Sequence, residues 1–265
     1  MSSTAPNFEA RFGRLALTGA AFAILVTLLA VAALAWAYVS TQSGSMAMSA
    51  GADIPSFAIF LTTWVVMMAA MMFPAFAPVV LVYAQYTRQR RGRWPLLAAF
   101  FVAGYLMIWS AVGVGAYVLV VLLVPLIVEI PAVQAAPQMF LGAVIGAAGL
   151  YQLTPLKDAL LAHCRSPFHW LLRGFRPGVR GALLMGIDEG VVCLGCCVGL
   201  MLVLLAVGLA SVGWMAAVAA VIFSEKILAP TPVVAKGVAV LLVGFGIAVA
   251  TIPAVAQFVM GGSPM

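Results

Sequence analysis

The residues with the greatest chemical potential lie in one apolar segment in the second half of the chain. Three thiols, Cys193, Cys196 and Cys197, fall close together there and follow the carboxylate of Glu189 and the thioether of Met185. On a helix that turns by ~100° per residue these side chains share one face, with Cys197 at its edge. Polar groups at membrane depth are costly and mark functional sites, so this face is a candidate site.

A second sulfur-rich stretch lies in an earlier apolar segment. Its four methionines, Met67, Met68, Met71 and Met72, are followed directly by two prolines. Helical periodicity places the four side chains on one broad face, at a depth similar to that of the thiols. Proline removes backbone hydrogen bonds, so we expect this helix to kink or open just beyond the methionines.

Thiolates and thioethers are soft ligands that select soft ions, Cu(I) first. We therefore predict that the second and fifth apolar segments bind Cu(I) between them. The predicted ligands are Cys193, Cys196, Cys197, Met67, Met68, Met71, Met72, Met201 and Glu189, the last as a hard ligand, charge balance or proton acceptor. Met46 and Met48, in a predicted outer loop without basic residues, form a predicted outer contact for the same ion.

Two other interpretations remain open at this level. Methionine fills gaps in cores and cysteine behaves as a small hydrophobe, so the chain could be an assembly subunit without a site of its own. A thiol oxidoreductase that cycles Cys193 and Cys196 is the other alternative, although thiols at i and i+3 of one helix reach disulfide geometry poorly. No nucleotide-binding motif is present, and an enzyme is the less favoured class.

The remaining charged and thiol groups are assigned simpler roles. Asp188 is predicted to pair with Arg180 or Lys226, because an unpaired carboxylate in lipid would take up a proton. Glu225 and Lys226 are predicted to act as structural ion-pair partners rather than as catalysts. Cys164 lies in a predicted cytoplasmic loop and is expected to be a reduced thiol without a role.

Composition indicates which elements must position these residues. With 65% hydrophobic and only 8% charged residues, the chain is typical of a protein that dissolves in lipid. We predict an all-α polytopic membrane bundle, with an N-terminal tail at 1–14, a single helical domain at 15–258 and a C-terminal tail at 259–265. Dividing the chain at its charges and prolines gives about seven predicted transmembrane helices that are long enough to cross a bilayer. They are 15–39, 56–86, 95–124, 137–154, 181–208, 211–228 and 235–258.

The basic residues predict the orientation of this bundle. All 13 Lys and Arg fall on one side of the predicted bundle. Basic residues stay on the cytoplasmic side, which places the N-terminus in the cytoplasm and the C-terminus outside. An inner amphipathic loop at about 155–180 is expected to rest on anionic lipid. The predicted partners are the lipid bilayer and a cuproprotein or metallochaperone, with a homo-oligomer left open. Nucleic acid is not implied by the net charge of +6.

Several motifs resemble a bacterial family of predicted metal-binding integral membrane proteins, a domain of unknown function. They cover about residues 55–230 and include Trp64-x-x-Met67-x-x-Ala70-Met71-Met72-x-Pro74, Cys193-x-Gly195-Cys196-Cys197 and Glu225-Lys226-x-x-x-Pro230. The resemblance implies metal binding and a multi-pass protein of the bacterial cytoplasmic (inner) membrane. The chain departs from the family pattern at Glu189, often His, at Leu160, often Cys, and at Ala210-Ser211, often Met-Asn, so potential ligands are missing.

Overall fold

The computed structural model describes residues 19–48, 56–89, 93–166, 171, 174–207, 211–228 and 233–259. Every regular element in these ranges is a helix, which confirms the all-α prediction. The longer helices are α2 (Gly19–Met48), α3 (Phe57–Gln89), α4 (Trp94–Val118), α7 (Pro137–Tyr151), α8 (Pro155–Arg165), α10 (Gly178–Val207), α11 (Val212–Phe223) and α12 (Val233–Thr251). Shorter helical segments are η2 (Leu119–Leu123), α5 (Val124–Val128), α6 (Pro131–Ala135), η3 (Ser224–Leu228) and α13 (Pro253–Val259), of which η2 and η3 are π-helices.

Five helical stretches in the described part of the chain are long and apolar enough to cross a membrane. They are Ala21–Thr41, Phe57–Gln89, Trp94–Val128, Gly178–Val207 and Val233–Thr251. Helices α7 and α8 pass the same test only together, and the pair is bent by 62° at the break between them. The count of seven spans and the direction of the chain across the bilayer therefore stay predictions.

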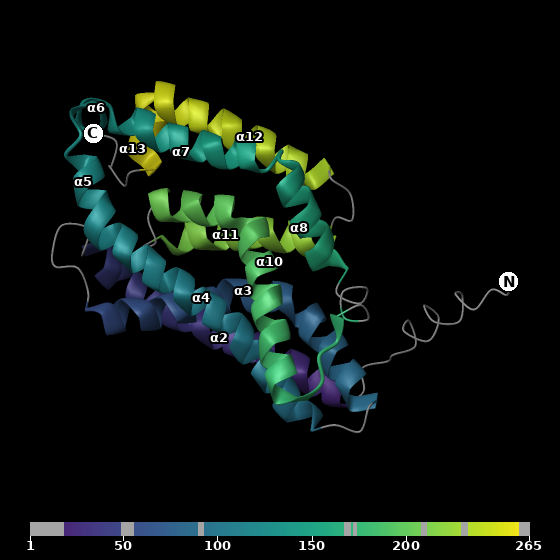
Figure 1. The fold of residues 1–265 in the computed structure, drawn as a ribbon. Helices are drawn as coiled ribbons and strands as arrows, with labels where there is room; N and C mark the ends of the chain where they lie inside the picture. Colours follow the sequence, from purple (N-terminus) through teal and green to yellow (C-terminus); the bar gives the residue numbers. More distant parts are fainter. Residues whose placement is uncertain are drawn as a thin grey trace, which may run out of the picture.

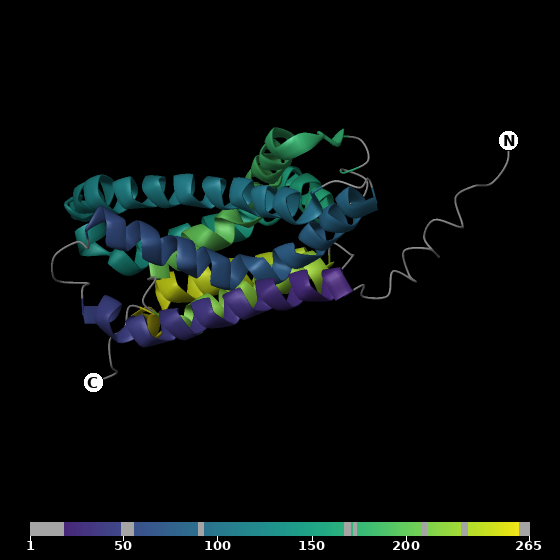
Figure 2. The same cartoon turned by 90° about the horizontal axis from the view of Figure 1, so that it is seen from below.

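Helix α10 occupies the centre of the arrangement. It packs most extensively on α4 and also contacts α7, α8 and α11, whereas α3 packs on α2 and α4. Figure 1 shows α2, α3 and α4 as one group and α7 with α12 as another, with α10 reaching from one group to the other. In Figure 2 the helices α2, α3 and α4 lie side by side with their axes nearly aligned.

Glycines allow α10 to approach its neighbours closely. A Cβ at Gly186 would overlap the carbonyl oxygen of Phe101 on α4, and one at Gly190 would lie 2.9 Å from Ile108. Farther along α10, a Cβ at Gly199 would press on Tyr151 of α7. Small residues are the usual means by which apolar helices bring their backbones together. Gly186 and Gly190 therefore lie on the face of α10 that packs closely on α4.

The structure bears on two local expectations. Helix α3 continues as one α-helix from Phe57 to Gln89 with both prolines inside it, so it is not interrupted beyond the methionines, and the expected kink stays a prediction. Helix α2 extends to Met48, so the segment with Met46 and Met48 is helical rather than a loop. The side chains of these two methionines lie outside the described part of the structure, and their predicted copper contact stays a prediction.

The close contact of α4 with α10 gives a test of the fold. Gly186→Ala should destabilise the protein by about 1–3 kcal/mol, because the new methyl group meets backbone that cannot move away. Gly115→Ala on the exposed side of α4 is the matched control, since nothing lies within 4 Å of its added Cβ. Thermal unfolding of the detergent-solubilised proteins should show a lower Tm for the first variant alone. Equal Tm values would contradict the close packing.

Candidate metal centre

Cysteines from two different helices meet at the inner side of α10. The Sγ atom of Cys164 on α8 lies 3.7 Å from that of Cys196 on α10, although the residues are 32 positions apart. Cys164 faces inward because α8 buries one side, made of Lys157, Leu161 and Cys164 at helical spacing. The expectation that Cys164 has no role missed this contact. The i, i+4, i+7 spacing of these three residues was the signal that could have revealed it.

Cys193 has a different environment from the other thiols. Its Sγ atom lies 2.9 Å from the Nζ atom of Lys226, which donates to it, and 3.0 Å from the hydroxyl of Tyr105 on α4. Lys226 also interacts electrostatically with Cys164 and Cys196. A buried thiolate is costly unless a cation and hydrogen bonds compensate its charge. Lys226 therefore supplies a positive charge that would compensate a Cys193 thiolate, the form that binds metals, if the thiol loses its proton.

The two other thiols of α10 donate hydrogen bonds within their own helix. Cys197 donates to the carbonyl oxygen of Cys193 at 2.9 Å, and Cys196 donates to the same oxygen at 3.1 Å. Among the residues that the structure describes, no three His, Cys, Asp or Glu side chains are arranged to hold one metal ion. The predicted ligands on α10 are thus buried together without forming a site of three or more donors. Cys196 therefore interacts both with Cys164 on α8 and with Cys193 and Cys197 on its own helix.

A buried ion pair fixes α8 against the π-helix η3. Lys157 and Glu225 are 2.7 Å apart between Nζ and Oε2, and their side chains are 0% and 3% exposed. Gln152 donates to the other carboxylate oxygen of Glu225 at 3.1 Å, and Arg165 donates to its backbone carbonyl at 2.8 Å. Lys157 was expected on a lipid-facing loop, and that interpretation is wrong, since it is fully buried. Glu225 is thus an ion-pair partner of Lys157, and its purely structural role stays a prediction.

The acidic residues of α10 differ in their surroundings. Asp188 pairs with Arg176 at 3.0 Å on a half-exposed surface, instead of with Arg180 or Lys226 as predicted. Glu189 is 3% exposed and interacts electrostatically with Lys226 and with Cys196. It lies one helical turn before Cys193. Glu189 is therefore the buried carboxylate that can balance charge beside the thiols.

The methionines of α3 belong to the same hydrophobic core as the thiols. Met67, Met68, Met71 and Met72 are 3% exposed or less, and Met201 on α10 is also buried. Helices α4 and α11 each contact both α3 and α10, so they connect the two sulfur-rich faces. Phe76 of α3 stacks on Tyr105 at 3.9 Å between ring centroids, and Tyr105 contacts Cys193.

One position at which the chain differs from the pattern of the family that it resembles, Leu160, lies beside the sulfur pair. Leu160 of α8 fills the space next to Gly195, where a Cβ would collide with its side chain. The position lies one helical turn before Cys164 and directly against the residue before Cys196. A thiol in place of Leu160 would therefore lie next to the sulfur pair, and its loss in this chain leaves an apolar wall there.

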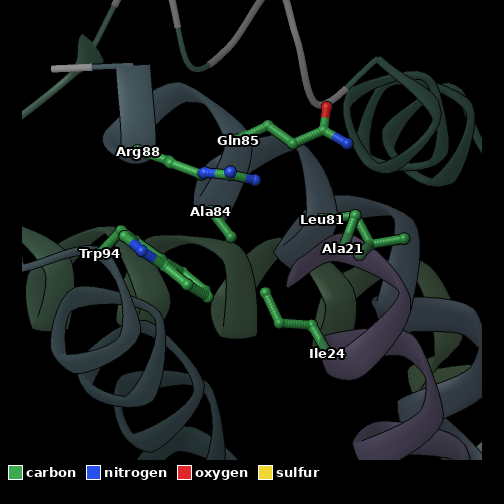
Figure 3. Close-up of a pocket in the computed structure, with 7 residues that line it drawn as sticks. All are labelled: Ala21, Ile24, Leu81, Ala84, Gln85, Arg88 and Trp94. Carbon is green, nitrogen blue, oxygen red and sulfur yellow. The ribbon is translucent and has the colours of Figure 1, made fainter. Parts of the chain in front are cut away.

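A cavity elsewhere in the protein lacks these donors. Its lining comes from α2, α3 and the start of α4: Ala21, Ile24, Leu81, Ala84, Gln85, Arg88 and Trp94. Figure 3 shows an apolar floor with the polar ends of Gln85 and Arg88 above it. No sulfur ligand lines this cavity, so it is not the candidate metal centre.

Comparison with known proteins adds one finding. A family model described as PpoB2, copper chaperone, matches residues 61–249, which include most of α3, the sulfur pair, η3 and most of α12. No curated protein and no solved structure matches the chain.

The buried ion pair should dominate the stability of the centre. Lys157→Met leaves Glu225 buried without its cation, which should cost about 3–5 kcal/mol, and a second change, Glu225→Leu, should recover part of that loss. Asp188→Asn breaks an exposed pair and should change stability by less than about 1 kcal/mol. Denaturation followed by circular dichroism tests the order of these effects. A Lys157→Met protein as stable as Asp188→Asn would contradict the structural role.

Proposed function

Because the chain belongs to the PpoB2 copper chaperone family, we propose that it is a bacterial inner-membrane protein that binds Cu(I) as cargo and delivers it to a partner cuproprotein. The single observation that carries this proposal is the contact between the Cys164 and Cys196 sulfurs, at 3.7 Å, beside the cation-supported Cys193. The copper relation comes from the family. The choice of residues, the oxidation state and the delivery step are our proposal.

The sulfur pair fits a soft, thiolate-bound ion. Metal–thiolate bonds of about 2.3 Å allow two sulfurs on one ion to lie up to about 4.6 Å apart, so 3.7 Å is within reach of a shared ion. Cu(I) accepts a pair of thiolates, whereas structural zinc sites take four ligands.

Lys226 gives this centre a way to exchange its cargo. It supplies a positive charge at the Cys193 sulfur in the absence of metal. When Cu(I) binds, one cation beside the thiolates replaces another, and the buried charge changes little. With Glu189 near the same cation, we propose that Cys193 joins Cys164 and Cys196 as a ligand when Lys226 moves away.

The methionines of α3 would take part in transfer rather than in tight binding. Thioethers are weak, neutral and soft ligands, and a buried series of them offers Cu(I) successive sites without charge. Met67, Met68, Met71 and Met72 share the core with the thiols and connect to Cys193 through Phe76 and Tyr105. We propose that this face is the path along which Cu(I) reaches or leaves the thiols.

The membrane location rests on the helices. Five described stretches are long and apolar enough to cross a bilayer, and basic residues lie at alternate ends of the predicted spans. A chaperone embedded in this way would hold copper away from water and pass it to a partner at the membrane surface.

Copper content tests the thiol centre. The purified reduced protein should bind Cu(I) near stoichiometrically, and Cys164→Ser or Cys196→Ser should raise the Kd by more than the ~10–100-fold that loss of an outer-shell partner costs. Val191→Ser, on the exposed side of α10, is the control and should keep the copper. Competition with a Cu(I) chelator measures the Kd. Unchanged values in both cysteine variants would show that Cu(I) does not bind at the sulfur pair.

Exchange kinetics test the methionines. A Met71→Leu, Met72→Leu double variant keeps side-chain volume, so its stability should change by less than ~1.5 kcal/mol. Loss of thioether ligands should slow Cu(I) transfer to a chelator by about tenfold, a barrier change of ~1.4 kcal/mol. Met107→Leu, at a 52% exposed position on α4, is the matched control. Equal rates for all three proteins would assign the α3 methionines to packing alone.

A further inference from the structure

The contact between Cys164 and Cys196 has the features of a redox pair as well as of a ligand pair. We propose that these two thiols reduce Cu(II) to Cu(I) by forming a disulfide with each other, and so generate the cargo beside the remaining sulfur ligands. The inference rests on the proposed function for the identity of the metal. Its structural basis is independent: two sulfurs on different helices, 3.7 Å apart, in a buried site.

A disulfide between Cys164 and Cys196 should form more readily than one within α10, because these two cysteines lie on different helices. A disulfide brings its sulfurs to about 2.05 Å, so the pair must close by about 1.7 Å from 3.7 Å. Side-chain rotation with a small shift of α8 can supply this distance, because α8 is a short helix that begins at a sharp break after α7. Cys193 and Cys196 lie on one rigid helix, where such an approach is blocked.

The thiols differ in their partners. Cys193 accepts from Lys226 and contacts Tyr105. Cys196 and Cys197 both donate to the carbonyl oxygen of Cys193, and Cys196 alone of the two also contacts Cys164 on α8. Cys164 is 9% exposed, whereas each thiol of α10 is 2% exposed. The pair therefore joins the most accessible thiol of the cluster to a buried one. An incoming cupric ion would meet Cys164 first.

The reaction balances without any bound cofactor. Each thiol loses one proton and one electron, one S–S bond forms, and two Cu(II) ions each accept one electron to become Cu(I). The two protons leave to solvent or to nearby acceptors such as Glu189. Return to the dithiol needs two electrons from external thiols by thiol–disulfide exchange.

The product changes the copper site. In the disulfide neither sulfur is a thiolate, so the pair no longer binds Cu(I) strongly, and Cys193 beside Lys226 becomes the nearest remaining thiolate. Oxidation of the pair would therefore release copper toward Cys193 and the core methionines. The same bond would connect α8 to α10 covalently and hold the ion-paired helix in place.

The test uses the full-length protein in detergent, reduced, copper-free and without oxygen. Cupric chloride is added with a chromophoric Cu(I) chelator, and the Cu(I) formed is measured beside mass spectrometry of unreduced peptides. We expect two Cu(I) ions for each disulfide formed. Mass spectrometry should show a disulfide link between the peptides that contain Cys164 and Cys196. Cys164→Ser and Cys196→Ser should lose the link and slow Cu(I) formation by tenfold or more. Cys193→Ser should still form the link.

Distinct outcomes separate this inference from copper binding. A link within α10, or Cu(I) formation as fast in Cys164→Ser as in the unaltered protein, would overturn the redox proposal. If the unaltered protein binds Cu(I) under reducing conditions but forms no Cys164–Cys196 link, the redox step fails and the chaperone function stands. If the link forms but the reduced protein does not bind Cu(I), the proposed function fails instead. Diamide, a metal-free oxidant, applied to the unaltered protein should give the same link if the variants fold poorly.

Discussion

The arrangement of the candidate centre depends on one buried ion pair, Lys157 with Glu225. Two charges without access to water must be matched closely, so this contact leaves α8 and η3 little freedom relative to each other. Because Cys164 lies two turns after Lys157 and Lys226 follows Glu225 directly, the same contact directs both residues at the thiols of α10. The π-helix η3 is an irregularity of the kind that often occurs at functional sites.

The second constraint is the close packing of α10. Its glycines bring it against α4 and α7, and this proximity lets Tyr105 reach Cys193 and Tyr151 reach the backbone at Gly195. Both hydroxyls place a polar group at the thiol segment from helices that are otherwise apolar. A sulfur centre in a membrane helix thus gains its polar partners from its neighbours, since its own backbone groups are used within the helix.

The family and the geometry contribute different parts of the functional argument. Membership in the copper chaperone family relates the chain to copper, while the buried thiols and thioethers are donors of the kind that soft ions select. The ammonium group of Lys226 lies beside the Cys193 sulfur. The proposal of reversible copper binding rests on these donors and on this charge.

The sequence by itself determined the helical class, the approximate limits of the helices and the two sulfur-rich faces, because these depend on local composition and on the 3.6-residue period. It also indicated the segment of α10 as the candidate site, which stays a prediction. Only the tertiary structure decided which groups meet: Cys164 with Cys196, Lys226 with Cys193, and Lys157 with Glu225. Those residues are far apart in the chain, and their contacts follow from the bend between α7 and α8, which no local pattern of the sequence specifies.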